Sequence, residues 1–302
     1  MSKENVRKIH EATMRILSST GVKFHHPDAV KVLKKNGIRV EGNIAYFTED
    51  DIMKWVKKAP AYTGFKGADP KYHAKIGGDL VLNAPAAGPT KIMEKDGTLR
   101  SAQIEDLVKM IKLYQQNDHY VINGGLPCQP ENVPEEWSTL LLYYVAQRHS
   151  NKALWCGCGN YEQMEAVVQM CCARYGLTTE ELKEDPHLFA IVNTNTPLQF
   201  DIRMTETLFT MLKYRQPVGI TAASMAGTTA PITLAGTVAL TNAEVIAVIA
   251  LSQMYAPGAP VIYGSQSTNA DMATCAIAIG SPEGALCYKY CAEMARFYGV
   301  PS

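Results

Sequence analysis

From Tyr120 onward the sequence alternates short, almost wholly apolar segments with longer amphipathic ones. The apolar segments occupy residues 120–125, 152–158, 188–195, 218–224 and 260–265. The segments that follow them have apolar residues at helical spacing, over 135–148, 161–175, 201–214, 231–256 and 283–298. Strands this uniformly apolar are buried on both faces, and their alternation with helices is typical of a parallel sheet. The pattern therefore predicts five β/α units.

Five units in line favour a barrel over a doubly wound sheet. A nucleotide-binding sheet would carry a G-x-G-x-x-G turn after a strand, and no strand is followed by one. We therefore expect an α/β fold of the TIM (β/α)8-barrel type over residues 76–302. Five strands do not close an eight-stranded barrel, so we expect a barrel that is incomplete in this chain. Its open edges predict association, as a homo-oligomer.

The first 75 residues follow a different pattern. Helical spacing over 6–17 and 29–35 is followed by an alternating stretch around the Glu41-Gly42-Asn43 turn, which predicts a hairpin. A third short helix is expected over 49–58. Residues 1–75 are therefore predicted to form a small α+β cap.

The balance of charge excludes several classes of partner. The chain has 29 basic and 29 acidic residues and no long run of either sign, so we expect no binding to nucleic acid or to an anionic membrane. No continuous apolar stretch approaches the roughly 18 to 20 residues of a membrane span. The charged N-terminus lacks the apolar core of a secretory signal. These features predict a cytosolic protein.

The eight cysteines are predicted to be small buried side chains. None forms a C-x-x-C pair, and most lie in apolar surroundings. Cys156 and Cys158 could hold a metal ion, but His149 precedes them at no spacing typical of a zinc motif. We therefore expect no metal site.

In parallel β/α folds the functional groups follow the carboxyl ends of the strands. At these five ends the side chains are mostly neutral and polar, with few acids and no histidine or lysine. The strand ends therefore lack the residues that Ser-His-Asp hydrolysis, Schiff-base chemistry and zinc hydrolysis require. We assign no catalytic residue. The residues expected to bind substrate are Asn123, Trp155, Asn195, Ser224, Tyr263, Gln266 and Asp271.

Two of these groups have a more specific interpretation. Trp155 and Tyr263 could form part of an aromatic cage for a cationic methylated nitrogen, although buried aromatic residues are commoner than cages. Asp271 could contact substrate or cap its own loop.

The segment SMAGTTAPITLAG (224–236) combines small residues with Pro231, which suits the first turn of a helix. It is either a tight, well-packed turn or a turn whose backbone lines a pocket for a large flat ligand. On the second interpretation, Gly227, Thr228 and Thr229 bind the cofactor. Further along, Glu244 lies inside a long apolar helix, where a charged residue is at the rim or paired, and we interpret it as structural.

Several segments resemble one protein family. They are IHEATMRILSSTGV (9–22), AVKVLKKNGIRV (29–40), TNTPLQFD (194–201), TAPITLAGTVALTNAEVIAVIALSQMYAPGAPVIYGS (229–265) and DMATCAIAIGSPEGAL…ARFYGVPS (271–302). In this order they resemble the trimethylamine methyltransferase family over nearly the whole chain.

The resemblance implies a TIM-barrel enzyme that demethylates trimethylamine or a quaternary amine such as glycine betaine. The implied methyl acceptor is the Co(I) of a cobalamin-type corrinoid on a separate protein, with no cofactor bound covalently to this chain. Some members of the family carry pyrrolysine shortly after the region that matches FYGVPS, and members that act on quaternary amines lack it. The family continues past this region, so the resemblance implies a C-terminal truncation, at an amber codon or by design.

This chemistry agrees with the neutral strand ends. A quaternary ammonium already carries the charge that makes its amine a leaving group, so the protein mainly orients the substrate, stabilises the cation and excludes water. The alternative is a non-catalytic truncated barrel that binds a corrinoid protein or another chain. A corrinoid-independent lyase would require a base that the sequence does not show.

Overall fold

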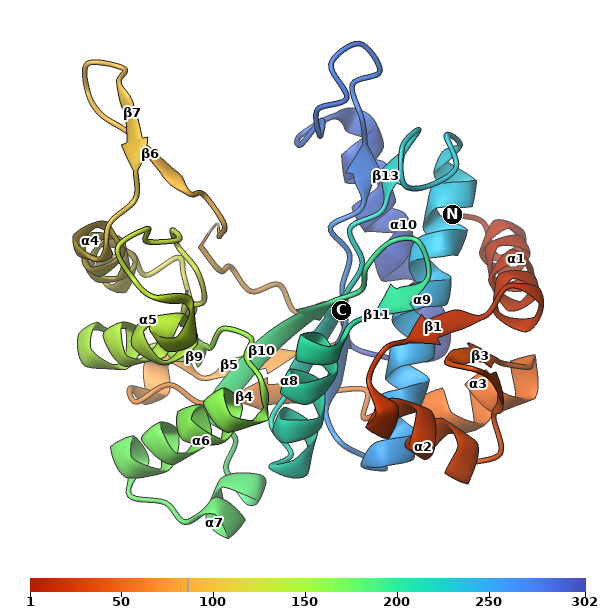
Figure 1. Cartoon of the computed structure of the whole chain (residues 1–302), viewed down its shortest axis with the longest axis horizontal. Coiled ribbons are helices and arrows are strands. Elements are labelled where there is room, and N and C mark those ends of the chain that lie inside the picture. Colours follow the sequence, from red (N-terminus) through yellow and green to blue (C-terminus); the bar gives the residue numbers. More distant parts are fainter. Residues whose placement is uncertain (86) are drawn as a thin grey trace.

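The computed structural model describes residues 1–85 and 87–302 and is built around a sheet of five parallel strands (Figure 1). These strands are β8 (Ile122–Gly124), β9 (Ala153–Trp155), β10 (Leu188–Asn193), β12 (Val218–Thr221) and β14 (Val261–Tyr263). Their order in the sheet is β14-β12-β10-β9-β8, and every neighbouring pair is parallel. The prediction of five parallel strands in sequence order is confirmed.

Each strand leads into a predicted helix. The helices are α5 (Glu135–His149), α6 (Tyr161–Tyr175), α8 (Ile202–Lys213), α9 (Leu234–Tyr255) and α10 (Pro282–Tyr298). Two more belong to this layer, α4 (Ile104–Gln116) before the first strand and the short α7 (Thr179–Glu184). The sequence analysis did not predict α7, which begins at a capping box formed by Thr178 and Glu181.

The two faces of the sheet pack against different partners. Along β10, Leu188, Ala190 and Val192 point into the large core beneath the helices, whereas Phe189 points to the opposite face. There the ring of Phe189 stacks on Phe65 with the centroids 5.0 Å apart. Phe65 ends β4 (Thr63–Phe65), which pairs with β5 (Ala74–Ile76), and the 3-10 turn Pro70–Tyr72 joins these two strands. This hairpin covers the face that does not meet the helices.

The N-terminal cap has the predicted helices and hairpin. It comprises α1 (Lys3–Ser19), β1 (Val22–Phe24), α2 (Pro27–Lys35), β2 (Arg39–Glu41), β3 (Ile44–Tyr46) and α3 (Glu49–Val56). A fourth strand of its small sheet comes from far along the chain, because β11 (Gln199–Phe200) pairs in parallel with β1. The segment that follows β10 therefore joins the cap to the central sheet.

By length and composition, α9 would be apolar enough to cross a membrane. In this structure it lies between the cap and the central sheet, in contact with α1, α3 and α10 (Figure 1). Its residues from Thr237 to Met254 are all buried. The long apolar run is thus accounted for by burial inside the protein.

Two pairs of short strands rise beyond the carboxyl ends of the sheet (Figure 1). One pair is the hairpin of β6 (Lys91–Met93) and β7 (Leu99–Ser101). The other joins β13 (Met225–Ala226) to β15 (Thr268–Asn269) and prolongs the pairing of β12 with β14. Among the described residues the sheet does not close, and β8 and β14 are its end strands.

Truncating Phe65 should destabilise the protein because the Phe189 ring would lose its stacking partner at a buried site. We expect Phe65→Ala to lower the free energy of unfolding by about 3–5 kcal/mol in a denaturant titration. Leu113→Ala is the control, since Leu113 is 66% exposed, and it should change that free energy by less than about 0.5 kcal/mol. Equal effects of the two substitutions would contradict the role assigned to the hairpin.

Candidate functional site

A cavity of about 270 Å³ lies at the carboxyl ends of β8, β9 and β10. Its wall is made of neutral side chains and backbone, apart from the guanidinium of Arg203. Trp155 from the end of β9 and Asn193 from the end of β10 face this space. Because strand ends of parallel β/α folds carry function, we take this cavity as the candidate site.

The position of the Trp155 ring depends on a glycine. Gly125 follows β8 with a φ of +68°, and a Cβ added there would lie 2.4 Å from Cε3 of Trp155. Only glycine satisfies both the backbone conformation and the close approach. The Gly124-Gly125 pair therefore seats the indole at the wall of the cavity.

Two residues of this site were missed as ligands by the sequence analysis. Asn193, whose side-chain oxygen accepts a hydrogen bond from the Thr221 hydroxyl, lies at a predicted strand end, but Asn195 was selected instead. The spacing along β10 could have identified Asn193. It lies two residues after Ile191 and four after Phe189, so all three side chains face the same side of the sheet.

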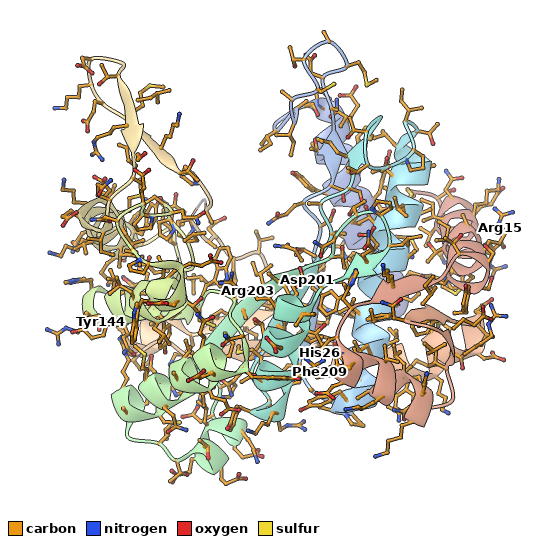
Figure 2. All side chains as sticks on the ribbon, viewed as in Figure 1. Arg15, His26, Tyr144, Asp201, Arg203 and Phe209 are labelled. Carbon is orange, nitrogen blue, oxygen red and sulfur yellow. The ribbon has the colours of Figure 1, made fainter. Side chains whose placement is uncertain are left out.

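Arg203, labelled in Figure 2, lies in the first turn of α8 behind the N-cap Asp201. Its guanidinium donates to the carbonyl oxygen of Cys158 at 2.8 and 3.2 Å and lies 3.7 Å from the Glu135 carboxylate. The local sequence gave no indication that Arg203 belongs to the site, because its contact with Cys158 joins two separate β/α units.

Three of the predicted substrate ligands lie near the strand ends but outside the wall of this cavity. Asn195 is exposed, and its backbone bridges to Gln199. Gln266 is also exposed, whereas Ser224 is buried with its hydroxyl 3.5 Å from that of Thr196. Their role in binding substrate stays a prediction.

Gly227, Thr228 and Thr229 form a tight turn after β13. The φ of Gly227 is +88°, and the amide groups of Thr228 and Thr229 both donate to the carbonyl of Met225. Both threonines are exposed. The turn therefore has the tight geometry expected, and contact with a cofactor remains a prediction.

Asp271 has the geometry of a loop cap. Its carboxylate accepts hydrogen bonds from the amides of Ala273 and Thr274, and these bonds hold the pKa of Asp271 below its usual value. The side chain is exposed at the tip of the β13–β15 pair. Of the two roles expected for Asp271, the structure supports the cap.

Asn123 and Tyr263 do not face the site, which corrects the prediction that they bind substrate. The Asn123 amide donates to the carbonyl of Ile111 and to the Ser150 hydroxyl, on the helix side of the sheet. The Tyr263 hydroxyl donates to Asn242 of α9 at 2.9 Å, also on that side.

The proposed aromatic cage is therefore wrong. Trp155 belongs to the face covered by the β4–β5 hairpin, and Tyr263 to the opposite core, so the sheet separates the two rings.

The two cysteines near the site differ in exposure, because Cys156 is buried and Cys158 is half-buried at the wall of the cavity. Burial raises the pKa of Cys158 to about 11 and that of Cys156 well above its usual value, so both are protonated at neutral pH. In the part of the chain that the structure describes, no three His, Cys, Asp or Glu side chains gather as a metal site.

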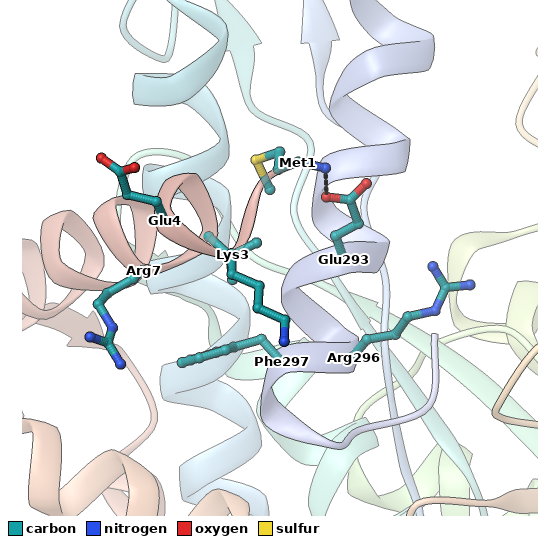
Figure 3. Close-up of a pocket in the computed structure, with 8 residues that line it drawn as sticks. Met1, Lys3, Glu4, Arg7, Glu293, Arg296 and Phe297 are labelled. Atoms are coloured by element: carbon teal, nitrogen blue, oxygen red, sulfur yellow. Dashed lines mark hydrogen bonds and ion pairs between the residues drawn. The ribbon is translucent and has the colours of Figure 1, made fainter.

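A larger cavity of about 750 Å³ lies on the outer layer, between α1 and α10 (Figure 3). It is lined mainly by charged and apolar side chains of these two helices, and the N-terminal ammonium group pairs with Glu293 at its edge. Since it is formed by outer helices and not by strand ends, we do not take it as the site.

The sheet and its neutral cavity define an α/β protein whose site lies at the carboxyl ends of parallel strands. Residues 1–302, the whole chain, match the family of trimethylamine methyltransferases (MTTB). The chain therefore belongs to this family, as its resemblance indicated.

Two relatives illustrate the match. The chain is 36% identical to a glycine betaine methyltransferase of Desulfitobacterium hafniense (strain Y51), over 100% of this chain and 63% of the relative. It is 28% identical to the trimethylamine methyltransferase MttB of Methanosarcina thermophila, over 99% of this chain and 63% of that protein. The chain thus spans less than two thirds of the length of these relatives.

A solved structure supports the fold. The monomethylamine methyltransferase MtmB in its hydroxylamine complex aligns with a TM-score of 0.55 at 11% identity, covering 99% of this chain and 65% of that one. At this identity the likeness concerns the fold alone.

Adding a methyl group at Gly125 should displace the Trp155 ring. We expect Gly125→Ala to lower the free energy of unfolding and to change the near-ultraviolet circular dichroism, because the new Cβ would overlap the indole. Gly176→Ala is the matched control, since Gly176 has nearly the same φ (+67°) and no atom within 4 Å of an added Cβ. Gly176→Ala should cost about 1–3 kcal/mol for the backbone alone. Equal losses in both variants would contradict the close approach.

Thiol reactivity should distinguish Cys158 from Cys275. Because its pKa is raised to about 11, Cys158 should stay unmodified by iodoacetamide at pH 8, whereas the exposed Cys275 should be alkylated first. Mass spectrometry of the intact and digested protein measures both. Faster alkylation of Cys158 than of Cys275 would contradict the raised pKa of Cys158.

Proposed function

We propose that this protein takes part in transferring a methyl group from a quaternary amine, such as glycine betaine, or from trimethylamine, to the Co(I) of a corrinoid on a separate protein. The observation that carries the proposal is the cavity beside Trp155, uncharged apart from Arg203, at the strand ends of a chain in the trimethylamine methyltransferase family. An indole face attracts an onium group through the cation–π interaction.

The sheet is proposed to be part of a TIM barrel. In support, the Tyr263 amide at the end strand β14 donates to the carbonyl of Pro301 at 2.8 Å. This bond lies on the open edge of β14, where a sixth parallel strand of a barrel would pair. The relatives' greater length is consistent with further β/α units.

The residues of the site would bind and orient the substrate. Trp155 would hold the onium group, Asn193 would fix its position, and the apolar part of the wall, formed by Leu126, Leu142, Ile191 and Met204, would exclude water. The corrinoid, a co-substrate on its own protein, supplies the nucleophile. As the methyl carbon is attacked, the C–N bond breaks and its electron pair remains on nitrogen, so a quaternary amine leaves neutral without a general acid.

A quaternary substrate suits these residues better than trimethylamine does. Removing a methyl group from neutral trimethylamine would expel the dimethylamide anion, a poor leaving group, so that substrate would need a proton or another activating group. Across residues 1–85 and 87–302, no acidic side chain lines the cavity. The 36% identity to a glycine betaine methyltransferase points the same way.

The remaining partners are also proposals. The exposed turn Gly227–Thr229 is suited to contact the corrinoid, because it lies beyond the strand ends with small side chains. We further propose a cytosolic protein that associates with copies of itself and with a corrinoid protein.

The test is methyl transfer by the intact protein to a reduced corrinoid protein, followed by the visible spectrum of the corrinoid. Transfer from glycine betaine or trimethylamine is expected. Transfer from neither, with the corrinoid protein still bound, would replace this proposal with a non-catalytic binding role.

Trp155 should matter to this activity more than an exposed tryptophan does. We expect Trp155→Leu to lower kcat/KM about tenfold, within the range of a lost cation–π contact of about 1–2 kcal/mol. Trp137→Leu is the control, because Trp137 is 58% exposed on α5, and it should leave kcat/KM unchanged. A wild-type rate in Trp155→Leu would remove Trp155 from the site.

A further inference from the structure

Glu244 is a fully buried carboxyl group near the middle of α9. Its Oε2 accepts hydrogen bonds from the hydroxyl groups of Thr194 at 2.5 Å and Thr196 at 2.9 Å. Its Oε1 accepts from the backbone amide of Leu198 at 2.7 Å. Burial raises the pKa of Glu244 above its usual value, and the three donors that converge on the two oxygens oppose this rise by favouring the carboxylate.

No cation neutralises this group. Among the residues that the structure describes, no Lys, Arg or His nitrogen lies within 4 Å of the Glu244 carboxylate. The expectation that a charged residue in this helix would be paired or at the rim is therefore wrong. A buried carboxylate without a cation costs stability, and such groups concentrate at functional sites.

The three donors belong to the segment that leaves the candidate site. Asn193 lines the cavity, and Thr194 to Leu198 follow it directly. Within this segment Leu198 has a φ of +57°, which a non-glycine residue adopts only when its surroundings hold it there. Glu244 holds it through the Leu198 amide, and its carboxyl group also bonds to Thr194, the residue that follows the wall residue Asn193.

The cavity itself supplies no negative charge. Its one charged side chain, Arg203, is a cation, partly offset by Glu135 at 3.7 Å. A field from a buried carboxylate is screened less than a field from an exposed one, so it reaches across a neighbouring residue.

We propose that Glu244 determines the preference of the site for a cationic substrate, by positioning the Thr194–Leu198 segment through three hydrogen bonds and by placing a carboxylate, in its ionised form, behind the wall. This inference rests on the proposed onium site and deepens it. Glu244 acts through this segment and touches no reacting atom, so it is a positioning residue.

The test compares two ligands of similar shape that differ in charge, tetramethylammonium and neopentyl alcohol, by calorimetry on the intact protein. We expect Glu244→Gln to raise the Kd of tetramethylammonium about tenfold and to change the Kd of neopentyl alcohol less than twofold. Glu244→Asp keeps the charge and should retain most of the selectivity for the cation.

Asn242→Ala is the matched control. Asn242 is equally buried on the same helix and bonds to Thr13, Tyr263 and Tyr298, so its loss should lower stability without changing the ratio of the two Kd values. If Glu244→Gln does not fold, Thr196→Val removes one donor and leaves the carboxyl group in place. It should weaken tetramethylammonium binding in the same direction.

The outcomes separate the two proposals. Suppose that the wild-type protein binds tetramethylammonium, and that Glu244→Gln weakens the binding of both ligands equally or of neither. The role of Glu244 is then overturned, and the onium site still stands. The same holds if Thr196→Val leaves the ratio of Kd values unchanged. Wild-type protein that does not bind tetramethylammonium overturns the proposed onium site and this inference with it.

Discussion

Parallel pairing of five strands is the constraint on which the rest of the structure depends. A parallel strand must return to the same end of the sheet, so each strand needs a crossover, and here every crossover contains a helix. The helices bury one face of the sheet, and the β4–β5 hairpin buries part of the other. All five carboxyl ends consequently meet at one edge, which is where the neutral cavity lies.

The site combines rigid supports with an almost uncharged wall. Trp155 is seated by a glycine that no other residue could replace without displacement, and Asn193 is held by Thr221. Behind the wall, Glu244 is held by three donors and balanced by no cation within 4 Å among the described residues. Such an arrangement suits a ligand that carries its own positive charge and needs orientation more than proton transfer.

The sequence specified the elements better than it specified the directions of their side chains. Strands apolar on both faces lack the alternation that tells one face from the other, and a shift of one residue reverses the direction of a side chain. For this reason Asn123 and Tyr263, both at strand ends, proved to face the helices, whereas Asn193 faces the cavity. Contacts between separate units, such as Arg203 with Cys158, left no local signal.

The pairing of β1 with β11 bears on how the chain is made. β1 lies near the start of the chain, and its partner at Gln199–Phe200 emerges only after β10, the third strand of the central sheet, has been synthesised. Until then one edge of the cap sheet has no partner, and α9, against which α1 and α3 pack, is still later in the chain. The cap is therefore among the first parts to be translated and among the last to reach its native contacts, which is the behaviour of a topology dominated by contacts distant in sequence.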